Sequence, residues 1–192
     1  MEIKVYKAVT ASAISMNIEI LARCLFNLPK PEIKDKIFEV DKRTGYFTYR
    51  DHTQLNSDMV KQNLPKNENE ARLMAKDFFV AANAKMGKSK ALKKQTFPYL
   101  FSSFLKYMSA YAVEHPEKQQ TDHWAVHYSI MLAPFPGAKK VLVLGQEVIV
   151  KIGNNGIVIS LDYNYRPVQM SLNITSNKQL KPQGNNGNRI LQ

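Results

Sequence analysis

Cysteine is scarce in this sequence: Cys24 is the only one among 192 residues. A single cysteine excludes an intramolecular disulfide, and it excludes the CxxC pair that many structural zinc sites use. Leu21, Leu25 and Phe26 flank Cys24 at helical spacing, which predicts a buried thiol on an apolar helix face. Because no histidine lies near Cys24 to act as a base, we expect a structural role for this thiol.

Long apolar runs are also absent. No stretch approaches the roughly 18 apolar residues that a membrane-spanning helix needs. The first residues, Met1 to Lys4, follow a strand pattern instead of the apolar centre of a signal peptide. These features predict a soluble chain. If an export signal was trimmed from before Met1, its absence here does not indicate the cellular compartment.

Familiar catalytic motifs are missing as well: there is no GxSxG, phosphate-binding loop or dinucleotide fingerprint. His123 and His127 have the HxxxH spacing of zinc hydrolases, but their segment alternates like a strand, where four residues span about 13 Å. One metal cannot bridge that distance, and Trp124 stands where the general base would be. The sequence therefore predicts no enzyme, no metal and no cofactor, while catalytic groups that converge from distant positions stay open.

Three acidic residues, Glu114, Glu117 and Asp122, cluster before the last predicted strands. Carboxylates in such a group are candidates for paired acids or for ligands of a hard cation. Pro116 and its polar neighbours predict an exposed loop, so we expect these side chains to be solvated charges.

The chain is strongly basic, with 27 Lys and Arg against 16 Asp and Glu and a formal charge of +11. Such an excess favours contact with nucleic acid, a phospholipid surface, a cell-wall polymer or an acidic protein, and it also keeps proteins in solution. No acidic residue lies between Asp77 and Glu114, so the charge is locally biased. The candidate polyanion contacts in this window are Lys85, Lys88, Lys90, Lys93 and Lys94. Because the window has no arginine, we expect any nucleic-acid contact here to have little sequence specificity.

Residue patterns in the first half predict a strand, a hairpin and helices. Alternation over 3–9 predicts a strand, and helical spacing after Ser15 predicts an amphipathic helix up to Asn27. Residues 37–40 and 46–49 predict a hairpin. Asn67 and Glu70 stand at the two positions of a capping box, which predicts a second helix with an apolar face from Ala71 to Ala82.

A third amphipathic helix is predicted over 97–113, where Phe97, Phe101, Phe104 and Met108 recur at helical spacing. Such a helix fits the protein core, and its apolar stripe beside the lysines would also suit a membrane surface. Its aromatic residues invite stacking on nucleic-acid bases, although helical spacing turns most of them toward the core.

From Trp124 onward the pattern changes to strands. Residues 124–132, 141–152 and 157–165 alternate, and Asn155-Gly156 predicts a tight hairpin turn between the last two. The whole sequence predicts an α+β fold in which two to three amphipathic helices pack on an antiparallel sheet made of this meander, the N-terminal strand and the hairpin. We divide it into an N-terminal subdomain (1–82), a basic and aromatic helical insertion (83–123), the meander (124–175) and a flexible tail (176–192).

Several short segments resemble PepSY-like domains of bacterial extracytoplasmic proteins. They are Trp124-Ala-Val-His-Tyr, the run GQEVIVKIGNNGIV from Gly145, Tyr165-Arg-Pro-Val, residues 38–49 and LPKNENEA from Leu64. The resemblance covers about residues 36–82 and 124–168. It implies a helix packed on an antiparallel sheet, no catalysis, and a propeptide-like or protein-interaction role outside the cytoplasm.

These observations favour a noncatalytic binding module, extracytoplasmic and PepSY-like, that docks a protein or cell-envelope partner through a sheet surface or edge. The alternative is a cytoplasmic nucleic-acid-binding protein that uses the lysines from Lys85 to Lys94.

Overall fold

The computed structural model describes residues 2–8, 25–26, 34–41, 46–55, 62–88, 105–133, 137–164 and 168–175. The elements of this part are β1 (Glu2–Ala8), β2 (Lys36–Val40), β3 (Phe47–Asp51), α2 (His52–Leu55), α3 (Glu68–Lys88), β4 (Leu105–Glu114), β5 (Thr121–Leu132), β6 (Val141–Ile152), a 3₁₀ turn (Asn154–Gly156), β7 (Val158–Asn164) and β8 (Val168–Thr175).

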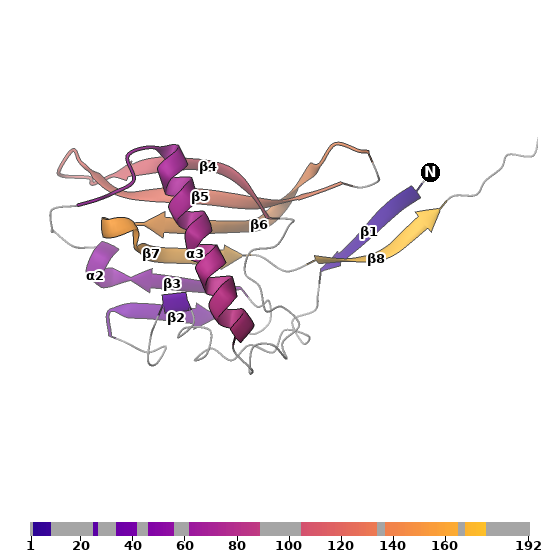
Figure 1. Cartoon of the computed structure of the whole chain (residues 1–192), viewed down its shortest axis with the longest axis horizontal. Coiled ribbons are helices and arrows are strands. Elements are labelled where there is room, and N and C mark those ends of the chain that lie inside the picture. Colours follow the sequence, from indigo (N-terminus) through magenta and orange to yellow (C-terminus); the bar gives the residue numbers. More distant parts are fainter. Residues whose placement is uncertain are drawn as a thin grey trace, which may run out of the picture.

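Six strands form one antiparallel sheet in the order β2-β3-β7-β6-β5-β4 (Figure 1). β5, β6 and β7 follow one another through antiparallel pairings, as the predicted meander requires, β4 extends the sheet beyond β5, and β2 and β3 add the predicted hairpin at the other end. The predicted N-terminal strand is also present as β1. It pairs with β8 in a separate two-stranded sheet instead of joining the large one, so the prediction of a single sheet is wrong.

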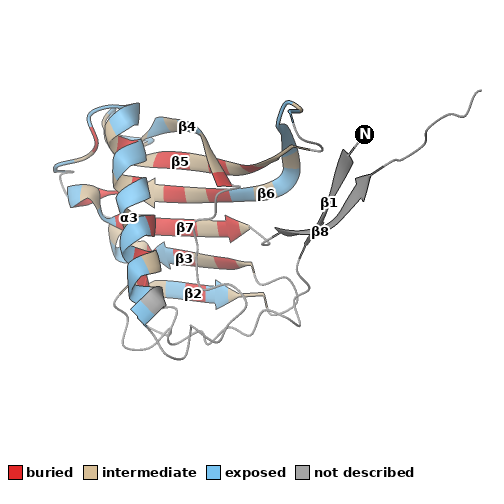
Figure 2. Cartoon of the chain, turned by 45° about the vertical axis from the view of Figure 1, so that its right-hand side comes forward, coloured by how far each residue is buried: buried red, intermediate tan, exposed pale blue. Residues whose placement is uncertain are grey.

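Helix α3 covers one face of the six-stranded sheet (Figures 1 and 2). Its buried stripe consists of Ala71, Ala75, Phe79 and Ala82, which recur at helical spacing and are at most 3% exposed. The three alanines let the helix backbone approach the sheet, and Phe79 fills the space between them. Val126, Val148 and Val150, all fully buried, form the centre of the sheet face below.

The start of α3 agrees with the predicted cap. The backbone N–H of Glu70 donates to the Asn67 side chain at 3.0 Å, which satisfies one of the unpaired amides at the helix N-terminus. The Glu70 carboxylate reaches back as expected, but it accepts from the Lys66 amide at 2.9 Å and not from that of Asn67. The chain is therefore fastened on both sides of the first turn.

The helix predicted over 97–113 is wrong where the structure describes it, because residues 105–114 form strand β4. The residues of β4 opposite Ile130, Tyr128, Val126 and Trp124 of β5 are Leu105, Tyr107, Ala110 and Ala112. A bulge between Tyr107 and Ser109 shifts the alternation by one residue. Met108, one of the residues on which the helix prediction rested, is the residue that this bulge leaves unpaired, and it is 45% exposed instead of facing the core.

Of the three predicted helices, one is confirmed, one is wrong where it is described, and one lies mostly outside the described residues, so the count of two to three helices is not confirmed. In the described part of the chain, α3 is the single long helix, and α2 has four residues. Of the helix predicted between Ser15 and Asn27, only Leu25 and Phe26 are described, and both are helical. Residues 97–104 and the predicted tail 176–192 lie outside the described residues.

Gly153, at the end of β6, has no room for a side chain. A Cβ atom there would lie 2.8 Å from Cγ2 of Ile159, and because Ile159 is fully buried, any shift that relieves this contact disturbs the packing around it. We expect Gly153→Ala to lower the free energy of unfolding by about 1–3 kcal/mol, as overpacking of a core usually does. Urea unfolding measures this loss. In the double variant Gly153→Ala, Ile159→Ala the clash is removed, so its loss of unfolding free energy should be smaller than the sum of the losses in the two single variants. Strict additivity would contradict the proposed clash.

Candidate binding pocket

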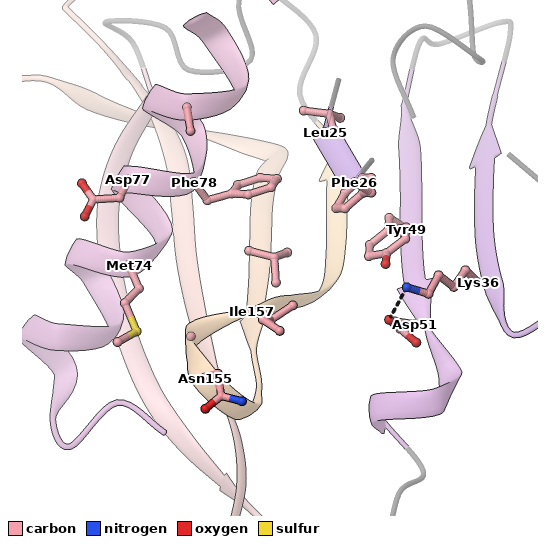
Figure 3. Close-up of a pocket in the computed structure, with 13 residues that line it drawn as sticks. Leu25, Phe26, Lys36, Tyr49, Asp51, Met74, Asp77, Phe78, Asn155 and Ile157 are labelled. Carbon is pink, nitrogen blue, oxygen red and sulfur yellow. Dashed lines mark ion pairs between the residues drawn. The ribbon is translucent and has the colours of Figure 1, made fainter. Parts of the chain in front are cut away.

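A pocket of about 490 Å³ lies between α3, the β2–β3 hairpin and the turn that joins β6 to β7 (Figure 3). Met74, Phe78 and Ala81 line it from α3, and Ile157 and Val158 line it from the start of β7. Leu25 and Phe26 close it from the N-terminal segment. Three segments that are far apart in the sequence therefore supply its apolar walls.

Aromatic side chains form one wall of the pocket. The Phe26 ring stacks on Tyr49 of β3, with 3.5 Å between centroids, and lies 5.8 Å from the Phe78 ring of α3. Burial of these rings removes a large apolar area from water. These contacts connect the helix, the N-terminal segment and the sheet around one apolar surface.

The polar corner of the pocket is centred on Asp51, which is only 4% exposed. Its carboxylate forms an ion pair with Lys36 at 3.1 Å and accepts hydrogen bonds from the amide and the hydroxyl of Thr53 at 3.1 and 2.5 Å. The hydrogen bond from the Thr53 amide caps the N-terminus of α2, because it satisfies a backbone donor that has no partner within the helix. Burial raises the pKa of the Tyr49 hydroxyl above its ordinary value, and the negative charge of Asp51 raises it further.

The turn between β6 and β7 forms the lower rim of the pocket. Asn155 and Gly156 have φ angles of 55° and 69°, the left-handed conformation that the predicted Asn-Gly turn requires. Gln62 holds this turn from the segment before α3: its amide donates to the Asn154 side chain at 2.8 Å, and its carbonyl accepts from the Asn155 amide at 3.1 Å. Asn63 adds a side-chain bond to Asn155 at 2.8 Å.

The chemistry of the pocket suits binding. Its buried carboxylate is already bonded to a lysine and a threonine, and its tyrosine hydroxyl is held neutral, so neither is arranged to pass a proton to a nucleophile. The exposed carboxylate of Asp77 and the side chain of Asn155 add polar surface, and the other lining side chains are apolar, which favours a ligand whose apolar group removes that surface from water.

The lysines singled out from the sequence lie elsewhere. Lys85 and Lys88 are exposed at the C-terminal end of α3, beyond the pocket. Lys90, Lys93 and Lys94 lie outside the described residues. Tyr107, one of the aromatic residues near them in sequence, packs against Tyr128, bonds to Glu68 and lies under the guanidinium of Arg72. Tyr107 is therefore engaged within the fold.

The two histidines of the HxxxH sequence lie on one strand, β5, and have different partners. His127 contacts the Tyr111 hydroxyl at 3.3 Å, and His123 contacts the Asp122 carboxylate at 2.7 Å. Asp122 is the extra residue of a bulge opposite Val113 and Glu114, and it is 7% exposed, so the expectation that it is a solvated charge is wrong. Glu114 and Glu117 are exposed as expected. Within the described ranges, no three histidine, cysteine, aspartate or glutamate side chains gather as metal ligands would.

Tyr128, whose ring meets Phe79 under α3, makes stability depend on alkaline pH. Burial raises its pKa from 10.0 to about 12. The unfolded chain therefore releases this proton at lower pH than the folded chain, and the stabilisation present below pH 10 is lost as the pH rises toward 12. We expect Tyr128→Phe to reduce the fall in unfolding free energy across this interval by up to about 2 kcal/mol. Urea titrations at several pH values on both sides of the interval measure it, and equal slopes for the two proteins would disagree with this assignment.

Comparisons with known proteins give no relative: no family model, no curated protein and no solved structure matches the chain. Among the described residues, no helix has the length and apolar character to cross a membrane.

Proposed function

We propose that the protein is a noncatalytic binding module, PepSY-like and extracytoplasmic, whose pocket receives an apolar group of a protein or cell-envelope partner. The observation that carries this proposal is the open pocket between α3, β3 and the β6–β7 turn, whose apolar walls come from α3, the N-terminal segment and β7 and whose buried carboxylate, Asp51, is already ion-paired. A helix packed on an antiparallel sheet is also what the PepSY-like resemblance implies.

The rim of the pocket is built to keep its shape. Asp51 fixes the start of α2, Gln62 and Asn63 fix the β6–β7 turn, and α3 is capped at Asn67. A pocket that is already formed loses little conformational entropy when it is filled, so apolar contact translates more fully into affinity. This supports docking over a role in which the pocket must reorganise.

Two neighbouring positions on α3 allow a matched test. Ala81 lines the pocket, whereas Val80 is 57% exposed and does not line it. Each position is replaced in turn by photo-leucine, a diazirine residue of about leucine size that leaves most of the pocket open, in cells of the source organism, followed by irradiation. We expect a discrete adduct in the envelope fraction from position 81 and none from position 80. Equal adducts from both positions, or none from position 81, would contradict docking in the pocket.

The nucleic-acid alternative keeps one supporting observation, the exposure of Lys85 and Lys88 at the end of α3. It predicts binding that falls steeply with salt and is lost when Lys85, Lys88, Lys90, Lys93 and Lys94 are changed to Glu. Unchanged retention of this variant on a polyanion column would eliminate that alternative, and nuclease-sensitive adducts in the irradiation experiment would favour it.

A further inference from the structure

The outer ends of β5 and β6 form an arm that projects past their neighbours in the sheet (Figure 2). We define the β5–β6 arm as Met131–Leu132 with Val141–Leu144. Leu132 pairs with Val141 and Met131 with Leu142, while β4 pairs with β5 only up to Ile130 and β7 pairs with β6 only from Glu147. Among the described strands, the arm therefore has two strands and an open edge on each side.

An irregularity at the base of the arm directs it away from the sheet. The pairing moves from Ser129 with Glu147 to Ile130 with Val143, so that residues 144–146 are passed over on β6. Gly145 has a φ of 72° at this point, a conformation that glycine adopts without strain. Figure 2 shows β6 curling out of the plane of the other strands here.

The arm exposes apolar side chains on both of its faces, while Leu132 and Val143 pack against the protein core. Consecutive strand residues point to opposite faces, and Val141 and Leu142 are 53% and 44% exposed. Leu144, in the irregular segment, is 84% exposed. Single exposed apolar residues are common on protein surfaces. Apolar residues on both faces of one strand are instead typical of strands that are buried on both sides. A protein partner that receives the arm in a groove on one side would leave the apolar side chains of the other face exposed to water.

The charge beside the arm is positive. Lys139 and Lys140 are both exposed and come directly before β6. The sequence from His123 to Gln146 holds no acidic residue that would balance them. Apolar side chains next to cationic ones match a surface that presents anionic headgroups above acyl chains.

We propose that the β5–β6 arm contacts a membrane surface and inserts Val141, Leu142 and Leu144 shallowly into an anionic phospholipid layer. Such a layer can cover the exposed side chains of both faces, Val141 on one and Leu142 on the other, at once. The open strand edges limit the depth, because unpaired backbone groups need the water and polar groups of the headgroup region. This site is separate from the pocket and does not depend on the proposed function.

Vesicle sedimentation with matched variants tests the site. The probes are vesicles of phosphatidylcholine alone and vesicles of equal parts phosphatidylcholine and phosphatidylglycerol. Leu144→Asp is compared with Leu73→Asp, since Leu73 is 56% exposed on α3. The pair Lys139→Glu and Lys140→Glu is compared with the pair Lys85→Glu and Lys88→Glu at the end of α3.

We expect the wild-type protein to sediment with the anionic vesicles and about tenfold less with the neutral ones. Each arm variant should weaken binding to anionic vesicles about tenfold, because each lysine and each buried leucine contributes to the free energy of membrane binding. The α3 control variants should change the binding less than threefold. Absence of binding, or equal losses in arm and control variants, would overturn the proposal. If the wild-type protein does not bind vesicles but forms a dimer that Leu144→Asp dissociates, a second copy of the chain, and not a membrane, contacts the arm.

A fluorescence measurement reports the insertion itself. Trp124 is the only tryptophan of the chain, and it packs against the protein core. We expect brominated acyl chains in anionic vesicles to quench the emission of Leu142→Trp and to leave the wild-type emission unchanged. Equal emission from Leu142→Trp with brominated and ordinary lipids would contradict insertion, even if that variant sediments with the vesicles.

Discussion

Replacement of Phe79 by alanine should lower the free energy of unfolding by about 3–5 kcal/mol, the usual loss for a buried aromatic residue. Phe79 is fully buried at the centre of the α3 stripe, where its ring meets Tyr128 of β5 and the ring of the preceding residue, Phe78. Alanine would leave a cavity between the helix and the sheet that rigid neighbours cannot fill. A loss of this size is a large part of the stability of a typical domain.

Urea unfolding followed by circular dichroism measures the effect of Phe79→Ala. If the variant is too unstable to purify, Phe79→Leu, which keeps most of the volume, supplies a smaller loss in the same direction. The matched control is Leu73→Ala on the exposed side of α3, which we expect to change stability by less than about 0.5 kcal/mol. Equal losses at both positions would contradict the packing of α3 on the sheet through Phe79.

Asp51→Ala should cost about 2–3 kcal/mol, the second largest effect that we expect. The substitution removes the acceptor for the Thr53 amide and hydroxyl and leaves Lys36 without its ion-pair partner. Hydrogen bonds to a buried charge stabilise more than neutral ones, and loss of one partner leaves the others desolvated. The Lys36 side chain is 32% exposed, so its ammonium regains water and the loss stays below that of a fully buried pair.

Two further variants separate the contributions at Asp51. Asp51→Asn keeps an acceptor for Thr53 but loses the charge, and we expect it to recover about half of the loss. Lys36→Met removes only the ion pair and should cost less than about 1 kcal/mol, as is usual for pairs with an exposed member. Thermal or urea unfolding of the three proteins gives the comparison. A larger loss in Lys36→Met than in Asp51→Ala would show that the ion pair, and not the anchoring of α2, dominates.

Local features of the fold could be predicted from the sequence because neighbouring residues determine them. The cap at Asn67 and the turn at Asn155-Gly156 depend on side chains and backbone conformations within a few residues, and the structure has both. The alternation that defines β5 is equally local. The strand at 105–114 escaped prediction because its bulge at Met108 breaks the period of two that identifies a strand.

The candidate pocket could not be predicted from the sequence for the opposite reason. Its walls combine Phe26, Tyr49, Phe78 and Ile157, which come together only after the sheet order is established. Nothing in the sequence near Tyr49 or Asp51 indicates that these residues meet α3. The lysines from Lys85 to Lys94, in contrast, are conspicuous in the sequence. The two that are described, Lys85 and Lys88, lie on the surface away from the pocket.

Methyl NMR with an uncharged apolar dye tests the central claim, that the pocket accepts an apolar group. N-phenylnaphthylamine is added to protein labelled at its methyl groups, and the resonances of Met74, Ala81 and Ile157 in the pocket are compared with those of Leu73 and Val80 on the outer side of α3. The account predicts shifts concentrated in the pocket group and suppressed by Ala81→Trp. Shifts confined to other methyl groups, or none in the pocket, would contradict it.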